Sequence, residues 1–262
     1  MRPRLIATDL DGTLLRSDGS VSERTAAALL AAEGAGITVV FVTGRPLRWA
    51  RDVFPHVGGH GRAIISNGAL VWDVAADRPI EVRAIAPEVG LRACSHLREA
   101  VPGTTYAVET LAGIALEPTF LERHRIPDGA PRGPIEAIFA APVLKLLARH
   151  EELGPQDFWD AAEEAIGDLV EITWSSSSSL LEISARDVTK ASTLEAMAAA
   201  MGVDRSEVVA FGDMPNDLPL LAWAGTGYAM ANAHPSVLAA TTHRAPSNDE
   251  DGVAQVIEHL IA

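Results

Sequence analysis

Apolar segments alternate with short polar turns from the start of the chain. Three continuous apolar or β-branched runs predict buried parallel strands at Leu5–Leu10, Ile37–Val42 and Arg62–Ser66. Segments with helical spacing separate these runs; the first follows Ser22, a side chain suited to a helix N-cap, and reaches about Ala32. Strand, helix and strand in this order predict right-handed crossovers and a parallel sheet.

The same rhythm returns near the end of the chain. Lys190–Met201 and Met214–Trp223 have helical patterns, and the apolar run Glu207–Phe211 between them predicts a strand. Further short elements are expected at Gly227–Met230, Pro235–Ala239, Thr241–Arg244 and Gly252–Ile261. We therefore expect residues 1–83 and 187–262 to form one α/β core with a doubly wound, Rossmann-like parallel sheet.

The middle of the chain, residues 84–186, has a different pattern. Prolines interrupt it repeatedly, and helical spacing is confined to Pro87–Ala100 and Pro155–Ile166. Short strands are predicted at Thr104–Val108, Val143–Ala148, Leu169–Trp174 and Leu180–Ser184, the last two of which could pair with each other. This pattern predicts an inserted α+β cap domain, with hinges near residues 82–86 and 184–187.

Composition and charge narrow the class of protein. The chain has 262 residues, of which 48% are hydrophobic and 21% charged, as in a globular protein. The net charge of −14 repels phosphate backbones and anionic lipid, so we expect neither nucleic acid nor a membrane as partner. Cys94 is the only cysteine, so we expect no intrachain disulfide and a reducing, cytoplasmic setting. No apolar run reaches the roughly 18 residues of a spanning helix. The protein is expected to be a monomer or a homodimer.

Two aspartates, Asp9 and Asp11, follow the first predicted strand, and Gly12 comes directly after them. Residues two apart in extended backbone point to the same side, so we expect the two carboxylates to lie together. Such a pair is costly unless a cation lies between the charges or one carboxyl holds a proton. A divalent metal meets the first condition and acid/base chemistry the second, although an isolated pair of this kind is more often a solvated turn.

A second acidic cluster, Gly212-Asp213-Met214-Pro215-Asn216-Asp217, follows another predicted strand. A helix cap requires one suitable side chain, whereas this segment offers Asp213, Asn216 and Asp217 together, which favours a metal site. Ligands gather outside the carboxyl ends of the strands of an open parallel sheet. We therefore expect this cluster to lie beside the first pair of aspartates.

Four further residues could bind a phosphate group. Thr43 and Gly44 supply a hydroxyl and backbone N–H groups before a helix, although an ordinary strand-to-helix turn explains them equally well. Arg45 follows them and either reaches the substrate or forms a salt bridge at the helix start. Lys190 would neutralise phosphate oxygens and nearby carboxylates, although a single lysine is usually a surface residue.

With these residues identified, the chain resembles the haloacid dehalogenase superfamily of aspartate-nucleophile phosphohydrolases. Its first to fourth motifs correspond in order to Asp9-Leu10-Asp11-Gly12-Thr13, Thr43, Lys190 and Gly212-Asp213-x-x-Asn216-Asp217. The resemblance covers the whole chain. The insertion resembles the α/β cap of the Cof-type sugar-phosphatase branch, and Ser66-Asn67-Gly68-Ala69 before it is also similar to that branch.

The resemblance implies a role for each matching residue. Asp9 would attack phosphorus, and Asp11 would protonate the leaving alcohol and then activate water. Mg²⁺ would be held by the Asp9 carboxylate, the Asp11 backbone carbonyl and Asp213, with Asp217 close by. Phosphate oxygens would be held by the backbone N–H groups of Leu10 and Gly44 and by the side chains of Thr43, Lys190 and Asn216.

We therefore expect a Mg²⁺-dependent phosphatase that hydrolyses a small phosphorylated metabolite, such as a sugar or polyol phosphate, through an aspartyl-phosphate. The cap would close over the site and select the substrate. One alternative is a phosphomutase or phosphotransferase on the same core, and another is a catalytically silent binding protein. The hydroxyl-rich run Ser175–Ser179 is either a turn or a contact for a sugar.

Overall fold

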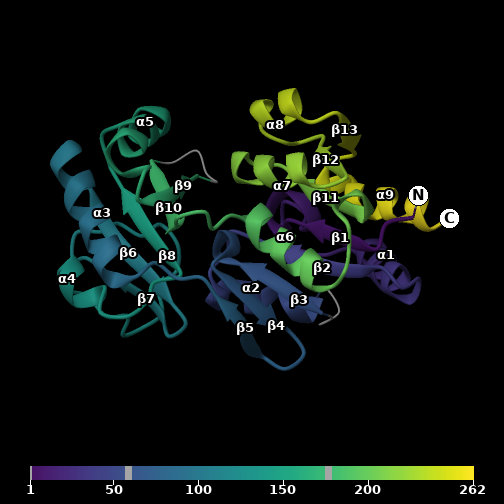
Figure 1. Ribbon diagram of the computed structural model, residues 1–262, viewed down its shortest axis with the longest axis horizontal. Coiled ribbons are helices and arrows are strands. Elements are labelled where there is room, and N and C mark those ends of the chain that lie inside the picture. The colour runs from purple at the N-terminus through teal and green to yellow at the C-terminus, as the bar shows by residue number, and fades with distance from the viewer. Residues whose placement is uncertain (1, 57–60, 175–178) are drawn as a thin grey trace. The chain divides into compact units, whose positions relative to one another are not determined.

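The computed structural model describes residues 2–56, 61–174 and 179–262. The chain divides into two compact units, which are treated separately below (Figure 1). The first unit comprises Met1–Glu81 and Thr189–Ala262, and the second comprises Val82–Val188. Most of the serine run at 175–179 lies outside the described residues.

The first unit is built on a sheet of eight strands, counted over the described residues. The strands are β1 (Leu5–Thr8), β2 (Thr38–Val42), β3 (Arg62–Ile65), β4 (Leu70–Asp73), β5 (Arg78–Val82), β11 (Val208–Gly212), β12 (Thr226–Met230) and β13 (His243–Ala245). Their order is β13-β12-β11-β1-β2-β3-β4-β5, and all neighbours from β13 to β3 pair in parallel. The chain moves outward from β1 in both directions, which confirms the predicted doubly wound core.

Helices cover both faces of this sheet (Figure 1). They are α1 (Glu23–Gly34), α2 (Leu47–Val53), α6 (Lys190–Ala200), α7 (Leu218–Trp223), α8 (Pro235–Ala240) and α9 (Gly252–Ile261). Helix α1 packs with α9, and α6 packs with α7. Because right-handed crossovers lead away from β1 in opposite directions, α1 and α7 lie on opposite faces of the sheet. The predicted cap of α1 is confirmed, since the Ser22 hydroxyl accepts the Thr25 N–H at 3.0 Å.

One edge of the sheet was not predicted. Strands β4 and β5 follow β3, and β4 pairs antiparallel with it. Every residue of β5 is exposed, so its sequence has neither the continuous apolar run nor the alternation that marks a buried strand. The predicted helix Met214–Trp223 is also interrupted, because a short 3₁₀ turn at Pro215–Asp217 precedes α7.

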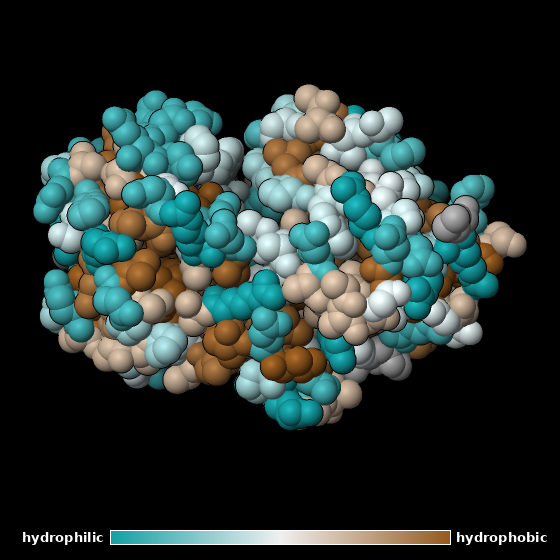
Figure 2. Space-filling view, viewed as in Figure 1, coloured by the Kyte–Doolittle hydropathy of each residue, from teal (hydrophilic) through white to brown (hydrophobic). Residues whose placement is uncertain are grey.

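The face drawn in Figure 2 has hydrophilic and hydrophobic residues interspersed. The most exposed large apolar side chains among the described residues are Leu121, Leu30 and Leu111, at 57%, 52% and 47% of their full exposure. Single exposed apolar residues of this kind are normal for a folded chain. Within the part of the chain that the structure describes, no helix has the length and apolar character needed to cross a membrane.

The second unit contains a five-stranded antiparallel sheet, again counted over the described residues, in the order β7-β6-β8-β10-β9. Its strands are β6 (Thr105–Thr110), β7 (Gly113–Leu116), β8 (Lys145–Arg149), β9 (Val170–Thr173) and β10 (Leu180–Ala185), and its helices are α3 (Pro87–Ala100), α4 (Ile135–Ile138) and α5 (Pro155–Ile166). Helices α3 and α5 have the predicted bounds, and the predicted pairing of the last two strands is confirmed. Strand β7 was not predicted.

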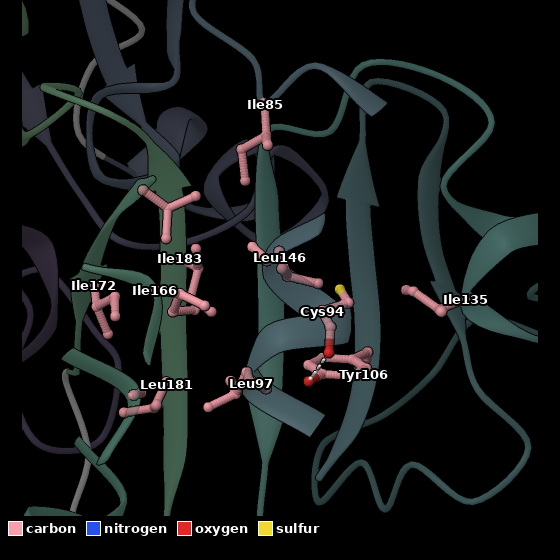
Figure 3. Packing of buried hydrophobic residues seen from close by; sticks show 14 of the residues in the cluster. Ile85, Cys94, Leu97, Tyr106, Ile135, Leu146, Ile166, Ile172, Leu181 and Ile183 are labelled. Atoms are coloured by element: carbon pink, nitrogen blue, oxygen red, sulfur yellow. Dashed lines mark hydrogen bonds between the residues drawn. The ribbon is translucent and has the colours of Figure 1, made fainter. Parts of the chain in front are cut away.

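Helices α3 and α5 pack against one face of this sheet and form the core of the second unit (Figure 3). Leu97 of α3, Ile166 of α5 and Leu146 of β8 are fully buried there. The Tyr106 hydroxyl donates a hydrogen bond to the Cys94 carbonyl at 2.9 Å, so the polar end of this buried ring is satisfied. The second unit therefore has its own apolar core, as an inserted domain requires.

Candidate active site

Three neighbouring strands of the first unit end in the residues that the sequence singled out. Asp9 follows β1, Thr43 follows β2 and Asp213 follows β11. Strand β1 lies between the other two and pairs in parallel with both. Their carboxyl ends meet at the point where the chain turns away from β1 in two directions, which is the usual position of a ligand site in such a sheet.

Lys190 contacts one aspartate from each of the two acidic segments, Asp9 and Asp217. It is the first residue of α6, whose start is fixed by a reciprocal cap between Thr189 and Ser192. Its Nζ lies 2.7 Å from Asp9 Oδ1 and 2.7 Å from Asp217 Oδ1, and the residue is only 2% exposed. Burial alone would lower the pKa of Lys190, but the carboxylates of Asp217 and Asp9 raise it above its usual value. Lys190 is therefore a buried cation that holds two carboxylates together.

Carboxylate oxygens of Asp9, Asp213 and Asp217 all lie within 4.8 Å of one another, and all three residues are buried. Burial raises the pKa of Asp9 well above its usual range, and Asp217 and Asp213 add to this increase. Burial and the Asp217 charge raise the pKa of Asp213 to about 7. Three buried carboxylates with one lysine leave negative charge that a cation can balance, and hard oxygen donors at this spacing fit Mg²⁺.

The turn after β1 positions Asp213. The Thr13 hydroxyl donates to Asp213 Oδ1 at 2.7 Å. Gly12 has φ +70°, a conformation that residues with a side chain seldom adopt, and a Cβ there would lie 2.4 Å from Asp213 Oδ2. Glycine is therefore required at this position both for the backbone conformation and for the close approach of Asp213.

Asp217 supports the loop that follows β11. Its Oδ2 accepts the backbone N–H groups of Asp213 and Met214, both at 3.0 Å, and its Oδ1 accepts the Lys190 ammonium. The residue is fully buried. Because both carboxylate oxygens already have partners, Asp217 is the member of the cluster best suited to orient its neighbours.

Asp11 does not belong to this buried group of three carboxylates. Its side chain is 58% exposed, and its two oxygens accept a bidentate pair of hydrogen bonds from Arg45 at 2.6 and 2.7 Å. The premise of an extended backbone through this pair does not hold, because β1 ends at Thr8 and an irregular helical turn begins at Leu10. Asp11 is nevertheless near enough for its charge to contribute to the raised pKa of Asp9. Of the two roles considered for Arg45, the structure contains the salt bridge, and the Asp11 carboxylate raises the arginine pKa.

Thr43 and the backbone after it form a tight turn before α2. The Thr43 hydroxyl accepts the Arg45 N–H at 3.0 Å, and the Thr43 N–H donates to the Ile64 carbonyl at 2.8 Å. Thr43 is 1% exposed. Helix α2 begins only at Leu47, so Thr43 and Gly44 lie in the loop before the helix rather than in its first turn.

Three asparagines without a predicted role, Asn67, Asn232 and Asn248, make hydrogen bonds that support the site. Asn216 Nδ2 donates to Asn67 Oδ1 at 3.1 Å. Asn232 Nδ2 donates to the Gly12 carbonyl at 2.7 Å, and Asn232 Oδ1 accepts the Asn248 N–H at 3.0 Å. In the sequence, the one feature that pointed to Asn67 was its place in the segment similar to the Cof-type branch. No sequence feature pointed to Asn232 or Asn248.

Comparison with known proteins identifies the class to which this fold and site belong. A family model of haloacid dehalogenase-like hydrolases matches residues 6–257, and the chain belongs to this family. A haloacid dehalogenase-like hydrolase from Bacillus subtilis shares the structure with a TM-score of 0.81 and 26% identity, over 98% of this chain and 99% of that one. A phosphatase of the same superfamily from Bacteroides thetaiotaomicron has the same fold, with a TM-score of 0.82 and 24% identity over 100% and 96% of the two chains.

Within the family, several similar proteins are named as phosphatases. The 5-amino-6-(5-phospho-D-ribitylamino)uracil phosphatase of Escherichia coli K12 is 29% identical over 274 residues, covering 100% of this chain and 97% of the relative. The pyridoxal phosphate phosphatase of the same organism is 29% identical over 275 residues, covering 100% of both chains. The chain is accordingly a phosphoric monoester hydrolase that acts on small phosphate esters.

Proposed function

We propose that this chain is a Mg²⁺-dependent phosphatase that hydrolyses a phosphorylated sugar or polyol through an aspartyl-phosphate on Asp9. One observation carries the proposal: Asp9 is buried at the carboxyl end of β1, fixed by Lys190, beside the carboxylates of Asp213 and Asp217. A nucleophilic carboxylate needs this combination of a fixed orientation and a cationic surrounding to approach a phosphate dianion.

In the first step a carboxylate oxygen of Asp9 attacks phosphorus and the ester oxygen leaves with its electron pair. Asp11 gives that oxygen a proton, so the product leaves as an alcohol. In the second step Asp11 takes a proton from a water molecule, whose oxygen attacks phosphorus and displaces Asp9. Inorganic phosphate is released, and both aspartates return to their starting states.

The remaining residues would orient the phosphate group and balance its charge. Mg²⁺ would be held by Asp9, the Asp11 carbonyl and Asp213, with Asp217 beside them, and would neutralise carboxylate and phosphate charge. Phosphate oxygens would be bound by Lys190, Thr43 and Asn216 and by the N–H groups of Leu10 and Gly44. Donors fixed before the reaction stabilise charge that develops in the transition state without reorganising.

Arg45 would act at the leaving-group end of the substrate. Its guanidinium holds both oxygens of Asp11, the proposed acid and base, in a planar bidentate pair. This contact orients the ionised Asp11 carboxylate, the form that takes a proton from water in the second step, relative to the turn after Thr43. To act as the acid of the first step Asp11 must carry a proton, so one of the two hydrogen bonds from Arg45 has to open. The second unit, Val82–Val188, would select the substrate. Relatives that act on a phosphorylated ribityl compound and on pyridoxal phosphate support a small, polar organic phosphate as the substrate.

The purified protein tests this proposal in a screen of sugar phosphates, polyol phosphates, nucleotides and cofactor phosphates. Release of inorganic phosphate is measured with Mg²⁺ and again with a chelator, and without any bisphosphate activator. We expect release from sugar or polyol phosphates that depends on Mg²⁺. Failure to hydrolyse any compound of the panel with Mg²⁺ would contradict the proposal, and activity only with a bisphosphate would favour a phosphomutase.

A further inference from the structure

The turn Ser66–Gly68, directly after β3, contacts the loop that carries Thr43. The Ser66 N–H donates to the Arg45 carbonyl at 3.1 Å, and the Asn67 N–H donates to the Thr43 carbonyl at 3.1 Å. Backbone groups on both sides of Gly44 are therefore held by one turn. The position of the proposed phosphate-binding N–H and hydroxyl depends on the conformation of that turn.

The same turn packs against the start of α6. A Cβ at Gly68 would lie 2.3 Å from the Thr189 carbonyl oxygen, so only glycine allows the two backbones to approach so closely. The Thr193 hydroxyl donates to the Gly68 carbonyl at 2.9 Å. Because Thr189 is the residue before Lys190, this contact also fixes the point from which the lysine side chain extends.

The Asn67 side chain makes the third contact, with Asn216. Asn67 Oδ1 accepts Asn216 Nδ2–H at 3.1 Å, and the two residues are 2% and 8% exposed. Asn216 Oδ1 is buried and has no hydrogen-bond partner among the described residues. An oxygen acceptor at Asn67 requires the nitrogen end of the Asn216 amide to face it. The second N–H of that nitrogen then remains for another acceptor.

The backbone of the turn is in a disfavoured conformation. Ser66 and Asn67 have φ of 53° and 55°, and Gly68 has φ of 110°. Two successive non-glycine residues rarely adopt the left-handed region, and asparagine tolerates it better than most residues. Such conformations persist where the surroundings hold them, and they occur most often at functional sites.

We propose that Asn67 is a positioning residue that orients the amide of Asn216, so that an N–H rather than the carbonyl oxygen faces the phosphate group. The turn Ser66–Gly68 fixes Thr43, Lys190 and Asn216 relative to one another, and its side-chain contact to Asn216 is made by Asn67. The inference rests on the proposed function, in which Asn216 binds a phosphate oxygen.

The test variant is Asn67→Gly, since glycine keeps the left-handed backbone and its N–H to Thr43 but removes the side-chain acceptor. We expect KM for p-nitrophenyl phosphate to rise about tenfold, and the inhibition constant of inorganic phosphate to rise by the same factor. A change of this size is expected when one orienting hydrogen bond is lost, and kcat should change much less. Asp77→Gly is the matched control, because Asp77 also has a positive φ of 47° but lies in the exposed turn between β4 and β5. Its kinetics should equal those of the wild type.

A double-mutant cycle with Asn216→Ala tests whether Asn67 acts through Asn216. In the Asn216→Ala background, Asn67→Gly should cause no further rise in KM or in the phosphate inhibition constant. Effects that multiply in the double variant would overturn the proposal, because Asn67 would then act independently of Asn216.

A measurement that needs no turnover separates this inference from the proposed function. The Asn216 side-chain amide signal in an NMR spectrum, assigned by its loss in Asn216→Ala, should exchange slowly with water in the wild type and rapidly in Asn67→Gly. Equal protection in both proteins would overturn the positioning role. A wild type with the expected amide protection that releases no phosphate from any ester would instead refute the proposed function.

Discussion

At the scale of single residues, the site is organised around buried charge. Lys190 joins Asp9 to Asp217, Asp217 holds the loop that carries Asp213, and Asp11 is held separately by Arg45. The two aspartates of the first motif therefore have different surroundings: Asp9 is enclosed, whereas the Asp11 side chain is 58% exposed. A nucleophile benefits from a fixed position, and an acid that exchanges protons with a leaving group and with water benefits from access to both.

Replacement of Asp9 tests the nucleophile directly. Asp9→Asn keeps the shape of the side chain but removes the attacking carboxylate, so kcat should fall by on the order of 10³-fold or more. Circular dichroism should still show the folded protein, because an amide oxygen at this position can accept from Lys190 and the lysine keeps Asp217 as a charged partner. Turnover near the wild-type rate would rule out an aspartyl-phosphate on this residue.

The Arg45–Asp11 pair predicts a dependence on the leaving group. Arg45→Ala releases the proposed acid from its fixed position, which should slow the loss of an alkyl alcohol, a leaving group that needs a proton. p-Nitrophenolate leaves without one, so kcat for p-nitrophenyl phosphate should fall much less than kcat for glycerol phosphate. Equal losses for the two substrates would show that Arg45 does not act through Asp11.

At the residue scale, the sequence predicted which side chains lie together wherever the order of parallel strands alone determines it. The carboxyl ends of parallel strands had to meet, and Asp9, Asp213 and Asp217 do lie together. It could not find Asn67 or Asn232, because their partners Asn216 and Gly12 are 149 and 220 residues away in the chain. Those contacts depend on how the loops pack in three dimensions, and no local pattern records them.

At the scale of elements, the sequence predicted best where burial leaves a periodic pattern. Helices α3, α5 and α9 have the predicted bounds, since each has one apolar face and a clear start at proline or glycine. Strands β4, β5 and β7 were not predicted, and for β5 the reason is physical, because it is exposed throughout. An edge strand needs a partner for its backbone but no continuous apolar surface.

The cap of α1 gives an element-scale prediction. Ser22→Ala removes the hydroxyl that accepts the Thr25 N–H, so the free energy of unfolding should fall by about 1 kcal/mol. Ser95→Ala, an exposed position inside α3, is the matched control and should change it by less than about 0.5 kcal/mol. Denaturant titration followed by circular dichroism measures both values. An equal effect in the two variants would mean that the cap does not stabilise α1.

At the scale of the whole molecule, the site joins segments from both ends of the first unit. Asp9 lies in Met1–Glu81 and Asp213 in Thr189–Ala262, the two parts between which the second unit is inserted. A cation shared by these carboxylates would bind the folded unit and not the unfolded chain, and would stabilise it accordingly. We therefore expect Mg²⁺ to raise the thermal unfolding midpoint of the wild type but not that of Asp213→Ala. Equal shifts in the two proteins would place the bound cation elsewhere.

The same cluster predicts how the stability of the metal-free protein depends on pH. The pKa of Asp213 is about 7 in the folded protein, raised by burial and by Asp217, against a usual value of 3.8. Between these values the folded state binds the extra proton, so the contribution of Asp213 to stability falls as pH rises toward 7 and is fully unfavourable above it. In a chelator, the unfolding midpoint of the wild type should therefore drop more between pH 5.5 and 8 than that of Asp213→Asn, which lacks the carboxyl at position 213 but keeps every other titratable group. Mg²⁺ should reduce the difference between the two proteins, since a bound cation favours the ionised carboxylate. Parallel pH profiles for the wild type and Asp213→Asn without metal would show that Asp213 is already ionised in the folded protein.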